Sequence, residues 1–214
     1  MRSFAHWTPR YLINRISEKF YRLAHPHAPW LTPSAIDYLQ THLKLDDKGI
    51  EFGSGRSTLW FAPRVASLIS VEHDPVWYKK VTSMLAQKGY SNVSCYLHLR
   101  GAGEPGQPEY LADAVILPDC SLDFALVDGI YRDLCLDVIL PKIKPRGMII
   151  VDNINLYMPC ASHAPNSIPL GKPAASPLWE KFMMTVSTWE SIWTSNGVTD
   201  TAIFIKPEKE YDHD

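Results

Sequence analysis

The chain has 214 residues, of which 46% are hydrophobic and 21% are charged, and its formal net charge is −2. This composition indicates an ordinary globular protein with one substantial core, and the near-neutral charge gives no reason to expect a nucleic-acid partner. No apolar run approaches the roughly 18 residues that a membrane-spanning helix needs, and the first residues lack the apolar core of a signal peptide, so we expect a cytoplasmic protein.

The first 30 residues combine basic and aromatic side chains. They hold five basic residues against the single acid Glu18, a net charge of +4, and residues 12–23 have helical spacing. Two interpretations remain open: an amphipathic helix packed on the domain with its basic face in water, or a lid or docking arm for an acidic substrate, a partner or a membrane surface. A second helix is predicted from Thr32 to about Leu43, with Pro33 in its first turn.

The middle of the chain alternates short apolar strands with helices. Strands are predicted over 49–52, 68–72, 93–99, 123–128 and 148–152. Helices are predicted over 57–65, 75–88, 110–116 and 132–143. This alternation is typical of a parallel α/β sheet that is buried on both faces.

The C-terminal part departs from that alternation. Residues 155–177 contain five prolines and predict a long loop, which is followed by a helix over 177–187. Two last strands, 189–193 and 201–206, are joined through Asn196 and Gly197 without a helix between them, which predicts an antiparallel hairpin at a sheet edge.

The predicted fold class is therefore α/β, with a doubly wound, mostly parallel seven-stranded sheet, an antiparallel C-terminal strand, and helices on both faces. We expect one domain over residues 46–207. Residues 1–45 are expected to form a helical cap of the same domain, and residues 208–214 a flexible acidic tail.

The turn after the first predicted strand is rich in glycine. In open α/β sheets, ligands bind beyond the carboxyl ends of the strands, and Gly53 and Gly55 would let the backbone approach one closely. A dinucleotide site has a third glycine where this chain has Thr58. Glu51 would repel a pyrophosphate and suits a cationic ligand, whereas Glu72, 19 residues after Gly53, stands where an acid accepts hydrogen bonds from ribose hydroxyls. These features favour S-adenosylmethionine over NAD.

Four motifs in this order resemble the class I S-adenosylmethionine-dependent methyltransferases, over about residues 33–206. They are the acid-x-Gly-x-Gly turn at 51–55, a strand that ends in an acid at 69–72, a strand that ends in Asp at 124–128, and the closing hairpin. The resemblance implies a cofactor site of Glu51, Gly53, Ser54, Gly55, Ser57, Glu72, His73, His98 and Asp128. Within it, Glu51 and the glycines would contact the methionine part, Glu72 the ribose, and Asp128 the methionine end or the reaction centre. His98 and Arg100 are the candidates for contact with the adenine.

Asp128, Asp152 and Asn153 follow two strands that the fold makes neighbours. Their oxygens are hard ligands suited to Mg²⁺, Mn²⁺ or Ca²⁺, and a bound cation could lower the pKa of a substrate hydroxyl. The arrangement is similar to that of the cation-dependent catechol and caffeoyl-CoA O-methyltransferases. Those families have a lysine three residues after the first Asp, where this chain has Tyr131, followed by Arg132. A metal site and an ion-free role in capping the strand end both remain open.

Methyl transfer is an in-line displacement, so much of its catalysis is positioning, and a base is needed only for a poorly ionised hydroxyl. The candidate catalytic residues are Asp128, Tyr131 and Arg132. His73 and His163 are further candidate bases, with an orienting and a solvent-exposed role as the alternatives. Trp60 and Trp77 are expected in the core.

We therefore predict an S-adenosylmethionine-dependent methyltransferase that O-methylates a small-molecule or glycan hydroxyl, with Mg²⁺ or Mn²⁺ as an optional second cofactor. The first alternative is an NAD(P)-dependent oxidoreductase, against which the missing third glycine counts. The second is an aminopropyl transferase of the spermidine-synthase type, which would want further acids. The third is a non-catalytic scaffold subunit of the same fold.

Overall fold

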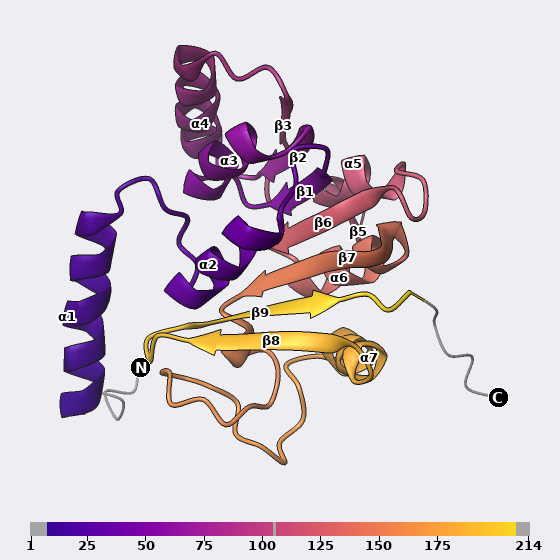
Figure 1. The fold of residues 1–214 in the computed structure, drawn as a ribbon. Coiled ribbons are helices and arrows are strands. Elements are labelled where there is room, and N and C mark those ends of the chain that lie inside the picture. The colour runs from indigo at the N-terminus through magenta and orange to yellow at the C-terminus, as the bar shows by residue number, and fades with distance from the viewer. Residues whose placement is uncertain (1–7, 105, 209–214) are drawn as a thin grey trace.

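The computed structural model describes residues 8–104 and 106–208. Its centre is a seven-stranded sheet with the strand order β3-β2-β1-β6-β7-β9-β8 (Figure 1). The parallel strands are β1 (Lys48–Phe52), β2 (Ser67–Glu72), β3 (Val93–Leu97), β6 (Leu122–Val127) and β7 (Ile143–Asp152). At one edge, β9 (Asp200–Ile205) runs antiparallel to both β7 and β8 (Glu190–Ser195). This topology confirms the predicted fold class. The predicted acidic tail lies outside the described residues from 209 onwards.

Helices cover both faces of the sheet (Figure 1). They are α1 (Pro9–Ala24), α2 (Pro33–His42), α3 (Arg56–Phe61), α4 (Pro75–Lys88), α5 (Ala112–Val115), α6 (Arg132–Ile139) and α7 (Pro177–Val186). Alternate side chains of a strand point to opposite faces. Phe124 and Leu126 of β6 therefore lie in the core with α2 and α3, whereas Ala125 and Val127 lie in the core with α6 and α7.

Two helices end earlier than predicted, and proline explains both. The helix predicted over 57–65 ends at Phe61 and continues as a 3₁₀ turn, Ala62–Arg64, that contains Pro63. The helix predicted over 132–143 ends at Ile139, and the following 3₁₀ turn contains Pro141. Proline has no N–H to donate and clashes with the preceding turn, so it ends an α-helix. A short hairpin of β4 (Gly103–Glu104) and β5 (Gln107–Pro108) was not predicted.

The strand ends that would hold a ligand meet at one edge of the sheet. β1 pairs with β2 on one side and with β6 on the other, so the strand order reverses at β1. Gly53 N–H donates to the carbonyl of Val71 (2.8 Å), and Asp128 N–H donates to the carbonyl of Phe52 (2.9 Å). These bonds join the glycine turn to the ends of both neighbouring strands, at the place where open α/β sheets bind ligands.

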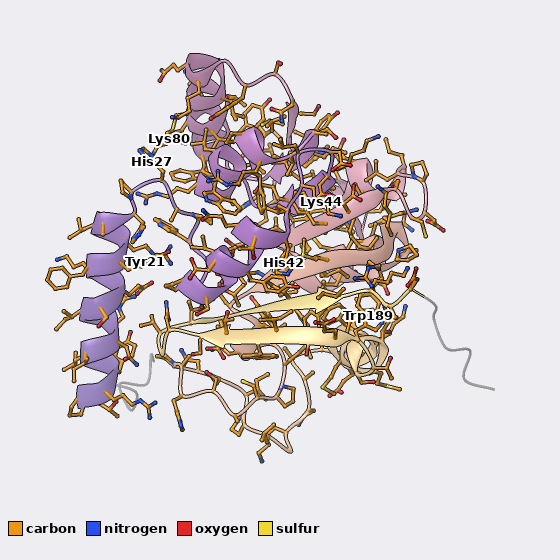
Figure 2. All side chains as sticks on the ribbon, in the orientation of Figure 1. Tyr21, His27, His42, Lys44, Lys80 and Trp189 are labelled. Atoms are coloured by element: carbon orange, nitrogen blue, oxygen red, sulfur yellow. The ribbon has the colours of Figure 1, made fainter. Side chains whose placement is uncertain are left out.

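Helix α1 stands apart from the layers and faces the carboxyl ends of the parallel strands (Figure 1). Its half-buried residues are mostly polar, and Tyr21 projects toward the domain, where it packs against the core that contains α2 (Figure 2). The first interpretation is therefore wrong about the apolar face, because the large apolar side chains of α1 are exposed and do not pack on the domain. Arg10, Arg15 and Lys19 are exposed to water, as that interpretation expected. Among the described residues, no helix is long and apolar enough to cross a membrane.

Candidate functional site

The two glycines of the turn differ in what they require. Gly53 has a φ of +101°, and a Cβ there would lie 2.9 Å from the backbone N of Gly129. A Cβ on Gly129 would in turn lie 2.2 Å from the hydroxyl of Tyr110. Gly55 is extended, and its nearest neighbour would be Nε1 of Trp77, at an ordinary 3.5 Å. The backbone conformation therefore demands glycine at Gly53 but only accommodates it at Gly55.

Glu51 lies behind the turn and does not line the cavity in front of it. Its side chain is fully buried and accepts hydrogen bonds from the hydroxyls of Ser57 (2.7 Å), Ser70 (2.7 Å) and Thr58. Burial raises the pKa of Glu51 to about 7, although the three hydroxyl donors oppose the rise. Glu51, which was predicted to touch a ligand, therefore connects the end of β1 to the start of α3 and to β2 through buried hydrogen bonds.

Glu72 ends β2 and is held in one orientation by backbone amides. Its Oε2 accepts from Ser54 N–H (3.0 Å), and its Oε1 accepts from the N–H groups of His73 (2.7 Å) and Asp74 (2.8 Å). The Nδ1 of His73 lies 2.9 Å from Oε1 without forming a hydrogen bond. A carboxylate accepts about four hydrogen bonds, so Oε2 has room for one more donor from the cavity.

A cavity of about 330 Å³, here the glycine-turn cavity, lies in front of the turn. Seven of the predicted cofactor residues line it: Gly53, Ser54, Gly55, Ser57, Glu72, His73 and Asp128. His98 does not line it, and its Nε2 lies 2.7 Å from the carboxylate of Asp113. Glu51 and His98 are thus the two predicted cofactor residues that lie outside the lining.

Two tryptophans that sequence reasoning did not place in the site also line this cavity. Trp77, expected in the core, is half-buried, and its Nε1 donates to the carbonyl of Ser54 (2.5 Å). Trp30 lies with its ring 5.5 Å from the guanidinium carbon of Arg56. The sequence does contain a signal for the position of Trp77. Asp74 is a typical N-cap residue directly after a strand end, and it places Trp77 in the first turn of α4, beside the expected ligand site.

Arg132 joins the ends of β6 and β7. Its Nη2 donates to the carboxylate of Asp128 (2.9 Å) and, more weakly, to Oδ1 of Asn153 (3.4 Å). Nη2 also donates to the backbone carbonyl of Asp128 (2.8 Å), while Nε donates to that of Gly129 (2.9 Å) and Nη1 to that of Asp152. One guanidinium therefore bonds the side chains of Asp128 and Asn153, two of the three that were predicted to bind a metal, and the backbone carbonyl of Asp152.

The carboxylate of Asp152 is also engaged within the protein. Its Oδ1 accepts from Thr201 (2.7 Å) and its Oδ2 from the amide of Asn153 (2.8 Å). Burial, and then the nearby negative charge of Asp128, raise the pKa of Asp152 to about 7. Among the described residues, no group of three or more His, Cys, Asp or Glu side chains could hold a metal ion. The metal site predicted at Asp128, Asp152 and Asn153, which has an amide as its third ligand, stays a prediction.

A larger hollow of about 1,340 Å³, here the α1 cleft, separates α1 from the strand ends. Asp152 and Asn153 line it, together with residues of α1 and of the loop after β7. The cleft shares three lining residues with the glycine-turn cavity, which are Trp30, Arg56 and Asp128. Asp128 therefore stands where the two hollows meet.

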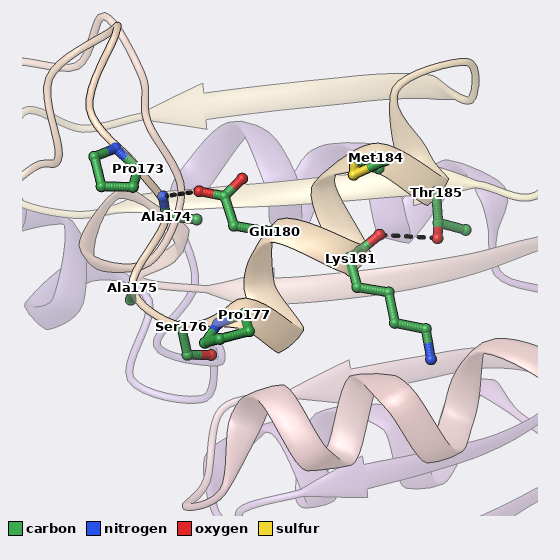
Figure 3. Close-up of a pocket in the computed structure, with 9 residues that line it drawn as sticks. All are labelled: Pro173, Ala174, Ala175, Ser176, Pro177, Glu180, Lys181, Met184 and Thr185. Atoms are coloured by element: carbon green, nitrogen blue, oxygen red, sulfur yellow. Dashed lines mark hydrogen bonds between the residues drawn. The ribbon is translucent and has the colours of Figure 1, made fainter.

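The remaining predicted residues lie elsewhere. Tyr131 and Arg132 line neither hollow, and the hydroxyl of Tyr131 accepts from Gly101 N–H (3.1 Å). His163 lines a separate pocket between the N-terminal part of α1 and residues 162–167. Another hollow of about 700 Å³ lies beside α7, where Glu180 accepts from Ala174 N–H (Figure 3). It shares no lining residue with the α1 cleft or the glycine-turn cavity.

No family model matches the chain, and no curated protein matches it in sequence. Solved structures do match its fold. A candidate caffeoyl-CoA O-methyltransferase from Staphylococcus aureus has a TM-score of 0.56 at 13% identity, over 90% of this chain and 91% of that one. A methyltransferase from Geobacter sulfurreducens has a TM-score of 0.54 at 14% identity, over 93% and 89%. An rRNA methylase from Streptococcus thermophilus has a TM-score of 0.52 at 12% identity, over 85% and 100%. The chain therefore has the class I S-adenosylmethionine-dependent methyltransferase fold.

Proposed function

We propose that the protein is an S-adenosylmethionine-dependent methyltransferase that transfers a methyl group to a hydroxyl of a small molecule or a glycan. The observation that carries the proposal is the position of Asp128, which lines both the glycine-turn cavity and the α1 cleft. A methyl donor in the first hollow and an acceptor in the second would meet at that carboxylate. In-line transfer requires this kind of juxtaposition.

The charge around the glycine-turn cavity supports this cofactor over a dinucleotide. Three acids, Glu72, Asp74 and Asp128, line the cavity, and Arg56 is the basic residue among them. Carboxylates this close would repel a pyrophosphate but favour the positive charge of a sulfonium. Bound S-adenosylmethionine supplies an electrophilic methyl group on that sulfonium, and the remaining acceptor position of Glu72 suits a ribose hydroxyl.

Asp128 is the residue that we expect to take the proton of the acceptor. Burial raises the pKa of its carboxyl group, and Arg132 opposes the rise. A raised pKa strengthens a carboxylate as a base, while the bond from Arg132 fixes its orientation. Arg132 is then a positioning residue, because it touches Asp128 and the strand ends but lines neither hollow.

We further propose that Arg132 supplies the positive charge that a divalent cation supplies in the cation-dependent O-methyltransferases. Its guanidinium lies between Asp128 and the end of β7 and is always protonated. On this account the reaction needs no added metal. The similar solved structures are described with different acceptors, rRNA among them, so the hydroxyl acceptor rests on the position of Asp128 and not on the fold.

The test is the release of S-adenosylhomocysteine from S-adenosylmethionine with a panel of phenols, catechols and sugars, in the presence and absence of a chelator. We expect turnover with at least one hydroxyl acceptor, no loss on chelation, and a fall in kcat of about 10²–10⁴-fold in Asp128→Asn. Asp113→Asn, which alters a carboxylate outside both hollows, is the control. Cofactor binding without turnover on any acceptor would contradict the enzyme assignment and favour the scaffold alternative.

A further inference from the structure

One side of α1 carries large apolar side chains that are exposed. Their spacing of three and four residues aligns them along one face of the helix, and their exposed fractions range from 43% to 68%. We call this set the α1 stripe, and it consists of Leu12, Ile13, Ile16, Phe20 and Leu23. None of the 16 residues of α1 is buried. Contiguous exposed apolar surface of this kind marks an interaction site.

The opposite, polar side of α1 holds the helix to the domain. Arg22 donates to the carbonyls of Pro29 (2.5 Å) and Leu31 (3.2 Å), and Glu18 lies 3.6 Å from the same guanidinium. Side chains on the other side of α1 project away from the rest of the domain (Figure 2). A surface helix normally buries its apolar stripe in its own core. In α1 no stripe residue is buried: three of them line the open α1 cleft, and Ile13 and Phe20 line neither hollow.

Helix α1 and the rest of the domain carry net charges of opposite sign. Residues 9–24 carry four basic side chains against one acidic, a net charge of +3. Residues 25–208 carry 15 basic against 19 acidic side chains, a net charge of −4. At 100° per residue, Lys19 falls next to one edge of the stripe, and Arg10 lies about 60° beyond the other edge. The stripe is therefore flanked by positive charge and backed by a negative domain.

We propose that α1 binds in the plane of an anionic membrane surface, with the stripe among the acyl chains and the flanking basic residues at the headgroups. An apolar face bordered by Lys and Arg is the pattern of interfacial helices, and each basic residue near an anionic surface adds to binding. A second copy of the chain is a less favourable partner for the stripe than a membrane, since two α1 helices would bring together two surfaces of the same positive charge.

The stripe is continuous with the α1 cleft. Leu12, Ile16 and Leu23 belong to both. Membrane binding would thus place the rim of the cleft at the headgroups, so that an acceptor presented by the membrane could reach Asp128. This last consequence rests on the proposed function, whereas binding of α1 to a membrane does not.

The experiment is flotation of the purified protein with vesicles of phosphatidylcholine alone and of phosphatidylcholine mixed with phosphatidylglycerol, without any cofactor. We expect binding to the mixed vesicles that is at least about tenfold tighter and that weakens with added salt. Because no cofactor or acceptor is present, a failed methyltransferase assay would leave this result standing.

Variants separate the apolar and the charged contributions. Ile13→Glu with Phe20→Glu alters two stripe residues that line neither hollow and should lower binding at least about tenfold. Val76→Glu with Ile116→Glu adds the same charge at side chains that are 78% and 80% exposed, and should leave binding within about twofold. Lys19→Glu should weaken binding to mixed vesicles about fivefold or more.

Thermal unfolding checks that all variants remain folded, which their exposure leads us to expect. The proposal is overturned if the wild-type protein binds neither vesicle. It is also overturned if the stripe variant and the control variant bind alike. A third result would also overturn the proposal: no vesicle binding, with a wild-type protein that is dimeric in light scattering and a stripe variant that is monomeric. That result would assign the stripe to a contact with a second copy of the chain.

Discussion

At the scale of single residues, Gly53 and Gly55 differ although both belong to the same motif. Gly53→Ala would force a side chain into a left-handed conformation and against the backbone of Gly129, whereas Gly55→Ala meets only ordinary contacts. A strained backbone of this kind costs about 1–3 kcal/mol. We expect Gly53→Ala to weaken S-adenosylhomocysteine binding at least about fivefold and Gly55→Ala less than about twofold, by isothermal titration calorimetry. Equal losses in the two variants would contradict this geometry.

The raised pKa of Glu51 predicts how the free energy of unfolding depends on pH. Its pKa is raised from 4.5 in the unfolded chain to about 7 in the folded one, so the folded state holds a proton that the unfolded state has lost. The stability from this group is complete below about pH 4.5 and is lost as the pH rises to about 7, by up to about 1.4 kcal/mol per pH unit.

Glu51→Gln should flatten this part of the profile, as measured by urea unfolding between pH 5 and pH 7.5, roughly the window just given. The flattening is partial, because the pKa of Asp152 is raised in the same direction. A variant whose stability falls with pH as steeply as that of the wild type would show that Glu51 is ionised in the folded protein below pH 7.

Some site residues could be predicted from the sequence, and others could not, for physical reasons. Gly53, Glu72 and Asp128 line the predicted cavity because they occupy strand ends, and parallel strands bring their carboxyl ends to one edge. The sequence does not show which way a strand-end side chain turns, so the burial of Glu51 under three hydroxyls was not predicted. The contacts of Arg132 with two strand ends depend equally on tertiary structure.

At the scale of elements, local signals set the accuracy of the predicted bounds. Helix α4 has the predicted limits because Asp74 caps its start and Gly89, in a left-handed conformation, caps its end. β7 begins five residues before the predicted strand, since its first residues, from Ile143, include a proline and a glycine that weaken a strand signal. Long-range pairing with β6 overrides that local preference.

The long loop over 157–176 is tied to the C-terminal hairpin by one buried carboxylate. Asp200 accepts from Ser162 (2.9 Å) and from Nε1 of Trp193 (2.8 Å) and is fully buried. Asp200→Ala would leave two half-buried donors without this partner, and each loss should cost less than that of a fully buried group, which is about 1–3 kcal/mol. We expect lower stability and faster hydrogen exchange in the loop.

The matched control is Asp119→Ala, which removes an ion pair with Lys142 whose carboxylate is 67% exposed. Exposed pairs contribute about 0–1 kcal/mol, so this variant should change stability little and leave exchange in the loop unaltered. If Asp200→Ala left exchange over 157–176 at the wild-type rate, the loop would be held by other contacts.

At the scale of the whole molecule, the strand order and the closing hairpin place two hollows side by side, with acids around the inner one and α1 across the outer one. The fold class followed from the alternation of strands and helices, which is a property of the whole chain. The exposure of the α1 stripe did not, because an amphipathic pattern gives the direction of the apolar face relative to the helix and not to the domain.

The most direct test of the central claim is thermal unfolding in the presence of S-adenosylhomocysteine, NAD⁺ or NADP⁺, for the wild type and for Gly53→Ala. At about 100 times its Kd, a ligand adds about 2.7 kcal/mol, which raises the Tm of a domain this size by about 5–10 °C. We predict such a rise with S-adenosylhomocysteine alone, and a smaller one at the same concentration in Gly53→Ala. A rise with a dinucleotide alone would contradict the account and make the chain an oxidoreductase candidate.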